Sequence, residues 1–441
     1  MSRSRTLSFV ASLSLVTTLF VVLPAIGSGD GKKDKDGVYR PLGLFTEVVS
    51  LVRSNYVEPV ELDPLLDGAF QGMTEAMDPF SEYVPPKRQQ AFLAAERSKE
   101  KKEVVESGAV LAKRLNYPIV VSAIAGSPAA AAGLKSDDLI EKIGDQPGRG
   151  LALWEADALL AGPPGTKVSV LVVRDGKPRR KTLTIVRSSW TPEGPSTSRV
   201  EGETVLRIPS FAPGTAATVR KTLETFDATK PLLLDIRGNA AGAFEEAART
   251  AALFVPAGPL GELKGKKIET RKFEAKEGER VHQSRLVVLM DSGTAGAAEL
   301  FASALRDGGA RQAGIKILPV PAPKSADAVA EEDADGVDPT PAPKPENTLN
   351  PVRLVGEPTT GMGLEQQVVR LGSGGSLKLS VGKVRSLSGR ALSPRGLDPD
   401  ERVFQLPPDE DSTAPPKDQI LQRGLRLLAE PANAADAKKA A

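Results

Sequence analysis

The chain has 441 residues, with 58 lysines and arginines against 56 aspartates and glutamates, so its formal net charge is +2. This balance excludes recognition of nucleic acid or of an anionic membrane by bulk charge, and an aromatic content of 4% excludes a base-stacking platform. The absence of cysteine and the presence of one histidine, His282, exclude thiol nucleophiles, disulfides and multi-histidine metal centres. Any nucleophilic catalysis must therefore use Ser or Thr, with Lys, a carboxylate or His282 as the base, and we expect no cofactor and no metal.

The N-terminus has the pattern of a targeting segment. Arg3 and Arg5 precede an uncharged apolar run over residues 7–26. A basic start followed by such a run predicts a signal peptide or a membrane anchor over residues 1–27, with a charged linker over residues 28–40. Whether the segment is cleaved or retained stays open. Either way we expect a protein of the periplasm or the cell exterior, attached to the inner membrane, if at all, only through this segment.

Residues 41–106 are predicted to be helical. Leu42, Phe45 and Val49 recur at helical spacing, as do several apolar residues further on. The pair Asp63-Pro64 supplies an N-cap and a proline for the first turn of a helix.

Residues 107–190 read as a small β-rich domain. Strands are predicted over residues 118–123, 168–174 and 181–186, with a hairpin turn at Asp175-Gly176, and a short helix over residues 154–160.

Residues 191–318 and 352–406 read as an α/β core. Leu232–Ile236 and Leu286–Met290 are continuous apolar runs, which are typical of parallel strands covered on both faces. Helical patterns flank both runs. The segment 319–351 is rich in proline and carboxylates and is predicted to be a disordered surface insertion. The last segment, residues 407–441, is predicted to hold one apolar helix over residues 420–428 and a tail.

The order of motifs resembles the C-terminal processing peptidase family, also called tail-specific proteases. The resemblance implies an α+β multidomain fold: an N-terminal helical segment, a PDZ-like β-rich domain, and an α/β core of the crotonase-like, tail-specific protease type with a Ser/Lys dyad. The motifs that carry the resemblance are Asn55–Glu58, Gly68–Phe70, Met77–Tyr83, Ser127–Ala129, Ala132–Leu134, Asp138–Ile140, Leu234–Gly242, Gly356–Thr359, Ser388–Arg390 and Gly396–Asp400. One departure is that the family's usual Gly-Asp pair reads Asp137-Asp138 here.

The PDZ-like segment implies peptide binding. Residues Ser107, Gly108, Ala109, Val110 and Leu111 lie where the family places its carboxylate-binding loop. Backbone N–H groups there would cap the terminal carboxylate of a peptide that adds a strand to the sheet edge. The resemblance thus implies unstructured protein or peptide C-termini as partners. A PDZ fold that serves only as a spacer or lid stays open as the alternative.

The catalytic motifs depart from the family pattern. The passage Ser292–Glu299 corresponds to the nucleophile motif and places Gly296 at the nucleophile position. The passage from Pro358 to Gly361 corresponds to the motif before the general base, and Met362 follows it, while the family glutamine survives as Gln366. The turn that helps form the oxyanion hole in the family corresponds to Ala241 and Gly242. Glycine has no nucleophilic oxygen and a thioether cannot act as a base.

Substitute groups are conceivable. Ser292 or Thr294 could supply a hydroxyl, with Lys316 or Lys383 as the base, although each hydroxyl would be displaced from the family position. His282 is predicted to be a surface residue.

The sequence therefore predicts a non-catalytic family member that binds protein C-termini as an adaptor or as a regulator of other envelope proteases. Two alternatives stay open: an active serine-type endopeptidase with relocated groups, and a purely structural envelope protein.

Overall fold

The structure is a computed structural model that describes residues 32–174, 179–317, 351–405 and 417–430. The predicted signal segment, the turn at residues 175–176 and the insertion 319–351 lie outside these ranges. The chain divides into two compact units, one ending at Ala69 and one beginning at Phe70. None of the helices in the described ranges is long and apolar enough to cross a bilayer.

The first unit is helical. It contains α2 (Lys32–Asn55) and the start of α3 (Leu62–Glu75), which continues into the second unit. Helix α2 begins at Lys32, within the segment predicted to be a linker, and carries Pro41 inside it. Apolar side chains that set the helical period, such as Leu42 and Phe45, are exposed in this unit.

A short connecting region follows within the second unit. It comprises β1 (Glu82–Val84), a 3-10 turn (Pro86–Arg88) and α4 (Gln89–Glu100). Phe92 of α4 packs edge-on against Trp154, with ring centroids 5.5 Å apart. This contact buries both rings and fixes α4 beside the following domain.

The β-rich domain is one antiparallel sheet with two helices. The strand order is β2-β3-β4-β6-β7, so β2 forms one edge of the sheet, and β5 pairs with β4. Ser127 caps α5 by accepting a hydrogen bond from the Ala130 N–H, and Pro128 occupies the first helical position. The elements are β2 (Ala109–Arg114), β3 (Tyr117–Ala123), α5 (Pro128–Ala131), β4 (Leu139–Ile143), β5 (Gln146–Pro147), α6 (Leu153–Leu160), β6 (Lys167–Arg174) and β7 (Arg179–Val186).

The core domain is built on a six-stranded sheet in the order β17-β14-β13-β10-β9-β8, which is parallel except for β8. The predicted strands Leu232–Ile236 and Leu286–Met290 appear as the neighbouring parallel strands β10 and β13. The sheet strands are β8 (Ser196–Val200), β9 (Glu203–Arg207), β10 (Leu232–Asp235), β13 (Leu286–Met290), β14 (Val352–Gly356) and β17 (Glu401–Arg402).

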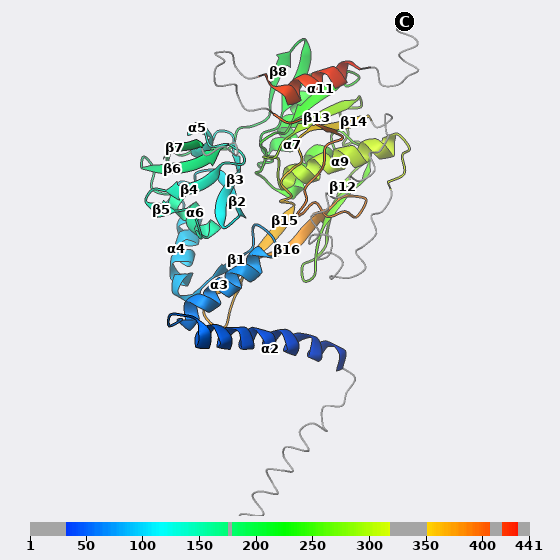
Figure 1. Cartoon of the computed structure of the whole chain (residues 1–441). Helices are drawn as coiled ribbons and strands as arrows, with labels where there is room; N and C mark the ends of the chain where they lie inside the picture. Colours follow the sequence, from blue (N-terminus) through cyan, green and yellow to red (C-terminus); the bar gives the residue numbers. More distant parts are fainter. Residues whose placement is uncertain (1–31, 175–178, 318–350, 406–416, 431–441) are drawn as a thin grey trace, which may run out of the picture. The chain divides into compact units, whose positions relative to one another are not determined.

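Both faces of this sheet are covered, which explains why its central strands are apolar throughout. Helices α7 (Thr215–Leu223), α8 (Phe244–Ala251) and α9 (Ala297–Gln312) pack on one face. Helix α11 (Gln419–Ala429) packs on the other, against Leu233, Val287 and Leu289. Figure 1 shows α9 and α11 on opposite sides of β13 and β14.

A second, antiparallel sheet adjoins the helical face. Its order is β1-β16-β11-β12, with β15 paired to β16. Leu260 and Leu263 of β11 and Val384 of β16 are buried in the same core as α9. The remaining strands are β11 (Gly258–Gly265), β12 (Arg271–Ala275), β15 (Leu364–Arg370) and β16 (Ser376–Arg385).

Candidate functional site

Three turns meet at one edge of the parallel sheet. They follow the carboxyl ends of β10, β13 and β14, which are adjacent strands in the sheet. In open α/β sheets this edge is where ligands bind, because the loops after neighbouring parallel strands converge there. We call the region around these three turns the cleft.

The turn after β13 carries Gly296 at the start of α9. Its backbone has φ +61° and ψ −115°, a conformation that residues with a side chain rarely adopt. A Cβ atom placed on Gly296 would meet one neighbouring heavy atom within 4 Å, the Met362 carbonyl oxygen at 3.7 Å. The two positions predicted for nucleophile and base are therefore neighbours, and the cleft has room for a small side chain at residue 296.

Glu299 holds these two positions together. Its carboxylate accepts hydrogen bonds from the Gly296 N–H at 3.0 Å, the Gly361 N–H at 2.6 Å and the Thr359 hydroxyl at 2.5 Å. The side chain is fully buried. Burial raises the pKa of Glu299 to about 7, although these donors, together with the Met362 N–H, act in the opposite direction. Glu299 thus links the start of α9 to the loop that ends at Met362.

The turn after β10 carries Ala241 and Gly242. The Phe211 N–H donates to the Ala241 carbonyl at 2.8 Å, which presses this turn against the strand end of β9. A Cβ on Gly242, whose φ is +115°, would lie 2.1 Å from the Phe211 carbonyl oxygen, so only glycine fits. The Ala295 N–H donates to the Asn239 carbonyl at 2.9 Å, which joins this turn to the one that carries Gly296.

Met362 lies in apolar surroundings. Its partly buried side chain packs against a cluster made of Phe80, Ala112, Val121 and Ala295. A cation at this position would lose much of its hydration. Gln366, the surviving family glutamine, donates from its side chain to the Phe80 carbonyl at 2.8 Å and so fixes the chain around Phe80.

The alternative hydroxyls already have partners. Ser292 donates its hydroxyl hydrogen bond to the Asp137 carboxylate at 2.9 Å. Thr294 is fully buried, and its hydroxyl contacts the Asp291 carboxylate and the Ile236 carbonyl. Asp137 itself has φ +66°, which suits the glycine that the family carries there.

The two alternative lysines differ in position. Lys316 follows the C-terminal end of α9, whereas Gly296 lies at its N-terminal end, and this 16-residue helix is about 24 Å long. Lys383 lies directly opposite Leu364 in the β15–β16 pair. Opposite residues of a pair share a face of the sheet, and Leu364 packs against the cluster around Met362. Of these two lysines, only Lys383 lies on the cleft side.

The predicted carboxylate-binding loop lies directly before the edge strand β2. Ser107 and Gly108 are buried, and Ala109, Val110 and Leu111 form the start of the strand. The Ile124 N–H donates to the Gly108 carbonyl and the Ala129 N–H to the Ser107 carbonyl, at 2.9 and 2.8 Å. Gly108 has φ +76°, and a Cβ there would lie 2.2 Å from the Ser127 Cβ. The loop therefore requires glycine at this position.

Comparison with known proteins identifies the domains. Residues 204–313 and 348–403 match peptidase family S41, residues 119–174 match a PDZ domain, and residues 28–87 match the N-terminal domain of the activating protease CtpB. The carboxy-terminal-processing protease of Bartonella bacilliformis is 26% identical over 410 residues, which cover 91% of this chain and 83% of that protein. CtpA of Bacillus subtilis, a carboxy-terminal processing protease, is 26% identical over 92% of this chain and 78% of its own length.

The core of the chain matches peptidase family S41, and the chain is similar over most of its length to carboxy-terminal processing proteases. Its structure also resembles that of the photosystem II D1 C-terminal processing protease, with a TM-score of 0.58 and 22% identity over 88% of this chain and 91% of that one. This likeness shows the fold alone. The family and the fold class predicted from the sequence are thereby confirmed, while the domain boundaries and the site residues stay predictions.

The position of His282 differs from the one expected from the sequence. The sequence predicts a surface residue, but the side chain is 2% exposed and lies near the Phe254 ring, with centroids 6.1 Å apart. Burial, and secondarily the nearby Arg280, lowers its pKa from 6.5 to about 4, so the ring is neutral near pH 7. It belongs to the core of the protease-like domain and lies outside the cleft residues described above.

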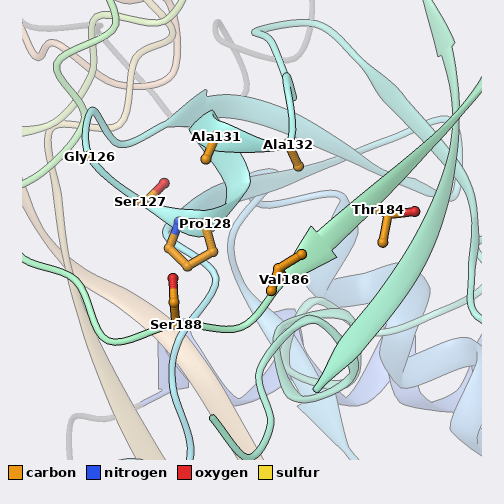
Figure 2. A pocket seen from close by; sticks show the side chains of 8 residues that line it. All are labelled: Gly126, Ser127, Pro128, Ala131, Ala132, Thr184, Val186 and Ser188. Atoms are coloured by element: carbon orange, nitrogen blue, oxygen red, sulfur yellow. The ribbon is translucent and has the colours of Figure 1, made fainter. Parts of the chain in front are cut away.

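Apart from the cleft and the predicted loop, the PDZ domain of this protease homologue contains a shallow hollow between α5 and β7 (Figure 2). Its volume is about 180 Å³, below the 300–1,000 Å³ typical of small-molecule sites. The hollow is lined by Gly126, Ser127, Pro128, Ala131, Ala132, Thr184, Val186 and Ser188. Within the described ranges, no three His, Asp or Glu side chains are grouped so as to hold a metal ion.

Sequence reasoning missed what Glu299 does. In the sequence, Glu299 is only the last residue of the motif that assigns the nucleophile position to Gly296. In the structure, the Glu299 carboxylate accepts hydrogen bonds from two turns of the cleft. A glutamate three residues after a helix N-cap is a known capping pattern, and that signal was present in the sequence.

Proposed function

We propose that this homologue of carboxy-terminal processing proteases is non-catalytic and binds unstructured protein C-termini through its PDZ domain, as an adaptor or as a regulator of other envelope proteases. The observation that carries the proposal is the pairing of Gly296 with Met362 at the meeting point of the three turns. The scaffold of the cleft is kept, and the two side chains that a Ser/Lys mechanism needs are absent from it.

The chemistry supports inactivity because both roles are lost at once. Acyl transfer needs an oxygen or sulfur nucleophile and a base that takes its proton. Gly296 offers no side chain, and the Met362 sulfur is at best a weak hydrogen-bond acceptor. Nucleophile and base act as a unit, so that removing either one removes most of the rate.

The surrounding groups do not replace the pair. The hydroxyl of Ser292 is directed to Asp137, and that of Thr294 is enclosed by Asp291 and Ile236. The active alternative would require Lys383 to reach one of these hydroxyls, and both are displaced from residue 296 by two or more positions. A displacement of about 1 Å already lowers rates roughly 100-fold.

Peptide capture, in contrast, needs only backbone groups. Strand β2 forms an edge of the PDZ sheet and follows the loop at Ser107 and Gly108, which we call the glycine loop. This arrangement can add a peptide as an extra strand and cap its carboxylate. The basic and apolar N-terminal segment supports a location in the periplasm or outside the cell, with the N-terminal segment as the sole membrane attachment.

A cleavage assay tests inactivity. The purified protein is incubated with an unstructured substrate, and products are followed by mass spectrometry. We expect no cleavage. Cleavage that survives repurification and is abolished by Ser292→Ala, Thr294→Ala or Lys383→Ala would support the active alternative instead.

A titration tests the binding role. Peptides with a free C-terminal carboxylate are compared with the same peptides ending in an amide, and we expect at least tenfold weaker binding of the amides. Equal affinity would argue against carboxylate capture at Gly108, and the absence of saturable binding would favour a purely structural protein.

A further inference from the structure

The far end of the β2 edge is occupied by the chain itself. The Lys113 N–H donates a hydrogen bond of 3.0 Å to the Pro79 carbonyl oxygen. Lys113 lies near the end of β2 that is remote from the glycine loop, and Pro79 lies outside the PDZ domain, just before β1. A backbone donor that a bound peptide strand would need is therefore already used.

The alternation of backbone groups shows which donors face this edge. The Gly108 carbonyl accepts from the N–H of Ile124, the residue directly after β3, so Gly108 is directed into the sheet. Successive residues of a strand direct their backbone groups to alternate sides. Ala109, Leu111 and Lys113 consequently face the open edge, in agreement with the bond from Lys113 to Pro79.

The side chain of Lys113 reinforces the contact. Its ammonium group pairs with the Glu75 carboxylate at 2.6 Å, and the lysine side chain is only 9% exposed. Phe80, next to Pro79, is buried against Ala112 of the same strand. The segment from Glu75 to Val84, which we call the strap, thus lies along the last residues of β2.

The strap also holds the opposite wall of the groove. A peptide bound to a PDZ domain lies between the edge strand and the helix beside it. Here these two elements are β2 and α6, and we call the space between them the groove and the two elements its walls. The Glu82 carboxylate accepts hydrogen bonds from the Leu153 and Trp154 N–H groups, the first two of α6. Glu82 is buried, and β1, to which it belongs, pairs with β16 of the core. The strap therefore contacts both β2 and α6.

The strap has internal support as well. The Asp78 carboxylate accepts from the Phe80 and Ser81 N–H groups at 2.9 and 2.8 Å, and from the Ser81 hydroxyl at 2.8 Å. Gln366 donates to the Phe80 carbonyl from β15. A peptide would have to break several of these bonds to extend past Leu111.

We propose that the strap closes the PDZ groove, so that it reads only the last three or four residues of a protein C-terminus. This inference rests on the peptide capture proposed above. With the terminal carboxylate at the glycine loop, the last residue lies opposite Ala109 and the residue two positions earlier lies opposite Leu111. The residue four positions earlier would need the Lys113 N–H, which Pro79 occupies.

Peptides of increasing length test the proposal. Peptides of three, four, six and eight residues share one C-terminal sequence and carry acetylated N-termini, and their affinities for the purified protein are measured by calorimetry. We expect the dissociation constants of the four-, six- and eight-residue peptides to agree within about twofold. An eight-residue peptide that binds tenfold more tightly than the four-residue one overturns the proposal.

Hydrogen exchange resolved to single amides gives a second measurement that needs no variant. The Lys113 amide is expected to be protected in the free protein and unchanged by peptide, whereas the Leu111 amide gains protection only when peptide binds. A Lys113 amide that exchanges freely without peptide, or that is protected only with it, overturns the proposal.

Strap variants sharpen the result. Glu75→Gln removes the ion pair with Lys113. Asp78→Ala removes the hydrogen-bond acceptor inside the strap, so in this variant peptides longer than four residues should bind at least threefold more tightly than they bind to the unmodified protein. Glu224→Ala, an exposed change at the residue that follows α7, serves as the control. If carboxylate-dependent binding persists but affinity rises with length in the unmodified protein, only the closed groove fails. If no peptide binds, or if amides bind equally, the proposed function fails and the closed groove with it.

Discussion

The cleft beside Gly296 and the groove beside Leu111 depend on different kinds of atoms. Catalysis in the cleft would need a side-chain oxygen and a side-chain amine, and two substitutions suffice to remove both. Peptide capture in the groove uses backbone N–H and C=O groups, which every residue except proline retains. The same chain can therefore lose one activity and keep the other while its fold is unchanged.

The difference also appears in what supports each region. The turns of the cleft are held by a buried carboxylate, Glu299, whereas the glycine loop is held by backbone hydrogen bonds and close packing around Gly108. Side-chain substitutions should therefore act on the cleft, and changes of backbone freedom should act on the groove.

Restoring both missing groups is expected to have the largest effect. In the variant Gly296→Ser with Met362→Lys, the apolar surroundings of residue 362 lower the pKa of the new lysine and favour its neutral, basic form. We expect cleavage of an unstructured protein at least about 100-fold faster than in either single variant, since nucleophile and base act as a unit. Product formation is measured by mass spectrometry.

Gly296→Ser with Met362→Ala is the matched control, since it adds the hydroxyl without the base. Because residue 296 has positive φ, the serine is also expected to cost about 1–3 kcal/mol of stability. A double variant that remains as inactive as its control would mean that the cleft has lost more than two groups, and the contrast between the two regions would be weaker.

Removing Glu299 should damage the cleft and spare the groove. Glu299→Ala leaves the Gly296 and Gly361 N–H groups and the Thr359 hydroxyl without their acceptor in a buried site. We expect a loss of about 3–5 kcal/mol in the free energy of unfolding, measured with denaturant.

The affinity for C-terminal peptides should stay within about twofold in the Glu299→Ala protein at temperatures where it is folded. Glu224→Ala, at an exposed position, should change stability by no more than about 0.5 kcal/mol. Peptide binding that falls together with cleft stability would show that the two regions are coupled.

The sequence was sufficient to predict the frame of both regions. The apolar runs Leu232–Ile236 and Leu286–Met290 predicted parallel strands, because strands buried on both faces are apolar throughout. That these two strands are neighbours came from the structure. The resemblance to the family's motifs assigned Gly296 and Met362 to one site, and the structure places the two residues close together.

Other features could not be predicted from the sequence, and each has a physical reason. The bond between Lys113 and Pro79 joins two backbone groups, so that no residue type marks it. The strand β15 has no buried residues, which hides its period from a search for an apolar face. His282 stands between polar residues such as Arg280 and Gln283, and its burial arises only from tertiary packing against Phe254.

A change of backbone freedom should act on the groove. In Gly108→Ala the new Cβ would lie 2.2 Å from the Ser127 Cβ and 2.9 Å from an atom of the Trp190 ring, at a φ of +76°. We expect peptide affinity to fall at least tenfold and stability to fall by about 2–3 kcal/mol, measured by calorimetry and denaturant unfolding. Gly165→Ala has a similar φ of +82° but nothing within 4 Å, and it should cost about 1 kcal/mol without weakening peptide binding. Equal losses of affinity in both variants would contradict a specific role for the loop.

The smallest expected effects are the opposing contributions of two buried groups, Glu299 and His282, to the dependence of stability on pH. The folded-state pKa of Glu299 is raised from 4.5 to about 7, so its contribution to stability is full below pH 4.5 and is lost as the pH rises toward 7. The pKa of His282 is lowered from 6.5 to about 4, so the unfolded state binds more protons in that range and stability rises with pH. Between about pH 4.5 and 6.5 the two slopes oppose each other.

Single variants should therefore reveal each slope. His282→Phe removes the rising contribution, so its free energy of unfolding is expected to fall by up to about 2 kcal/mol relative to the unmodified protein as the pH rises from 4.5 to 6.5. Glu299→Gln removes the falling contribution, and its stability is expected to rise by a similar amount relative to the unmodified protein over the same range. Denaturant unfolding at a series of pH values measures both. A stability difference from the unmodified protein that does not change with pH would mean that the substituted group titrates normally. For Glu299 this would mean that the cleft admits water and is less closed than its packing around Met362 implies.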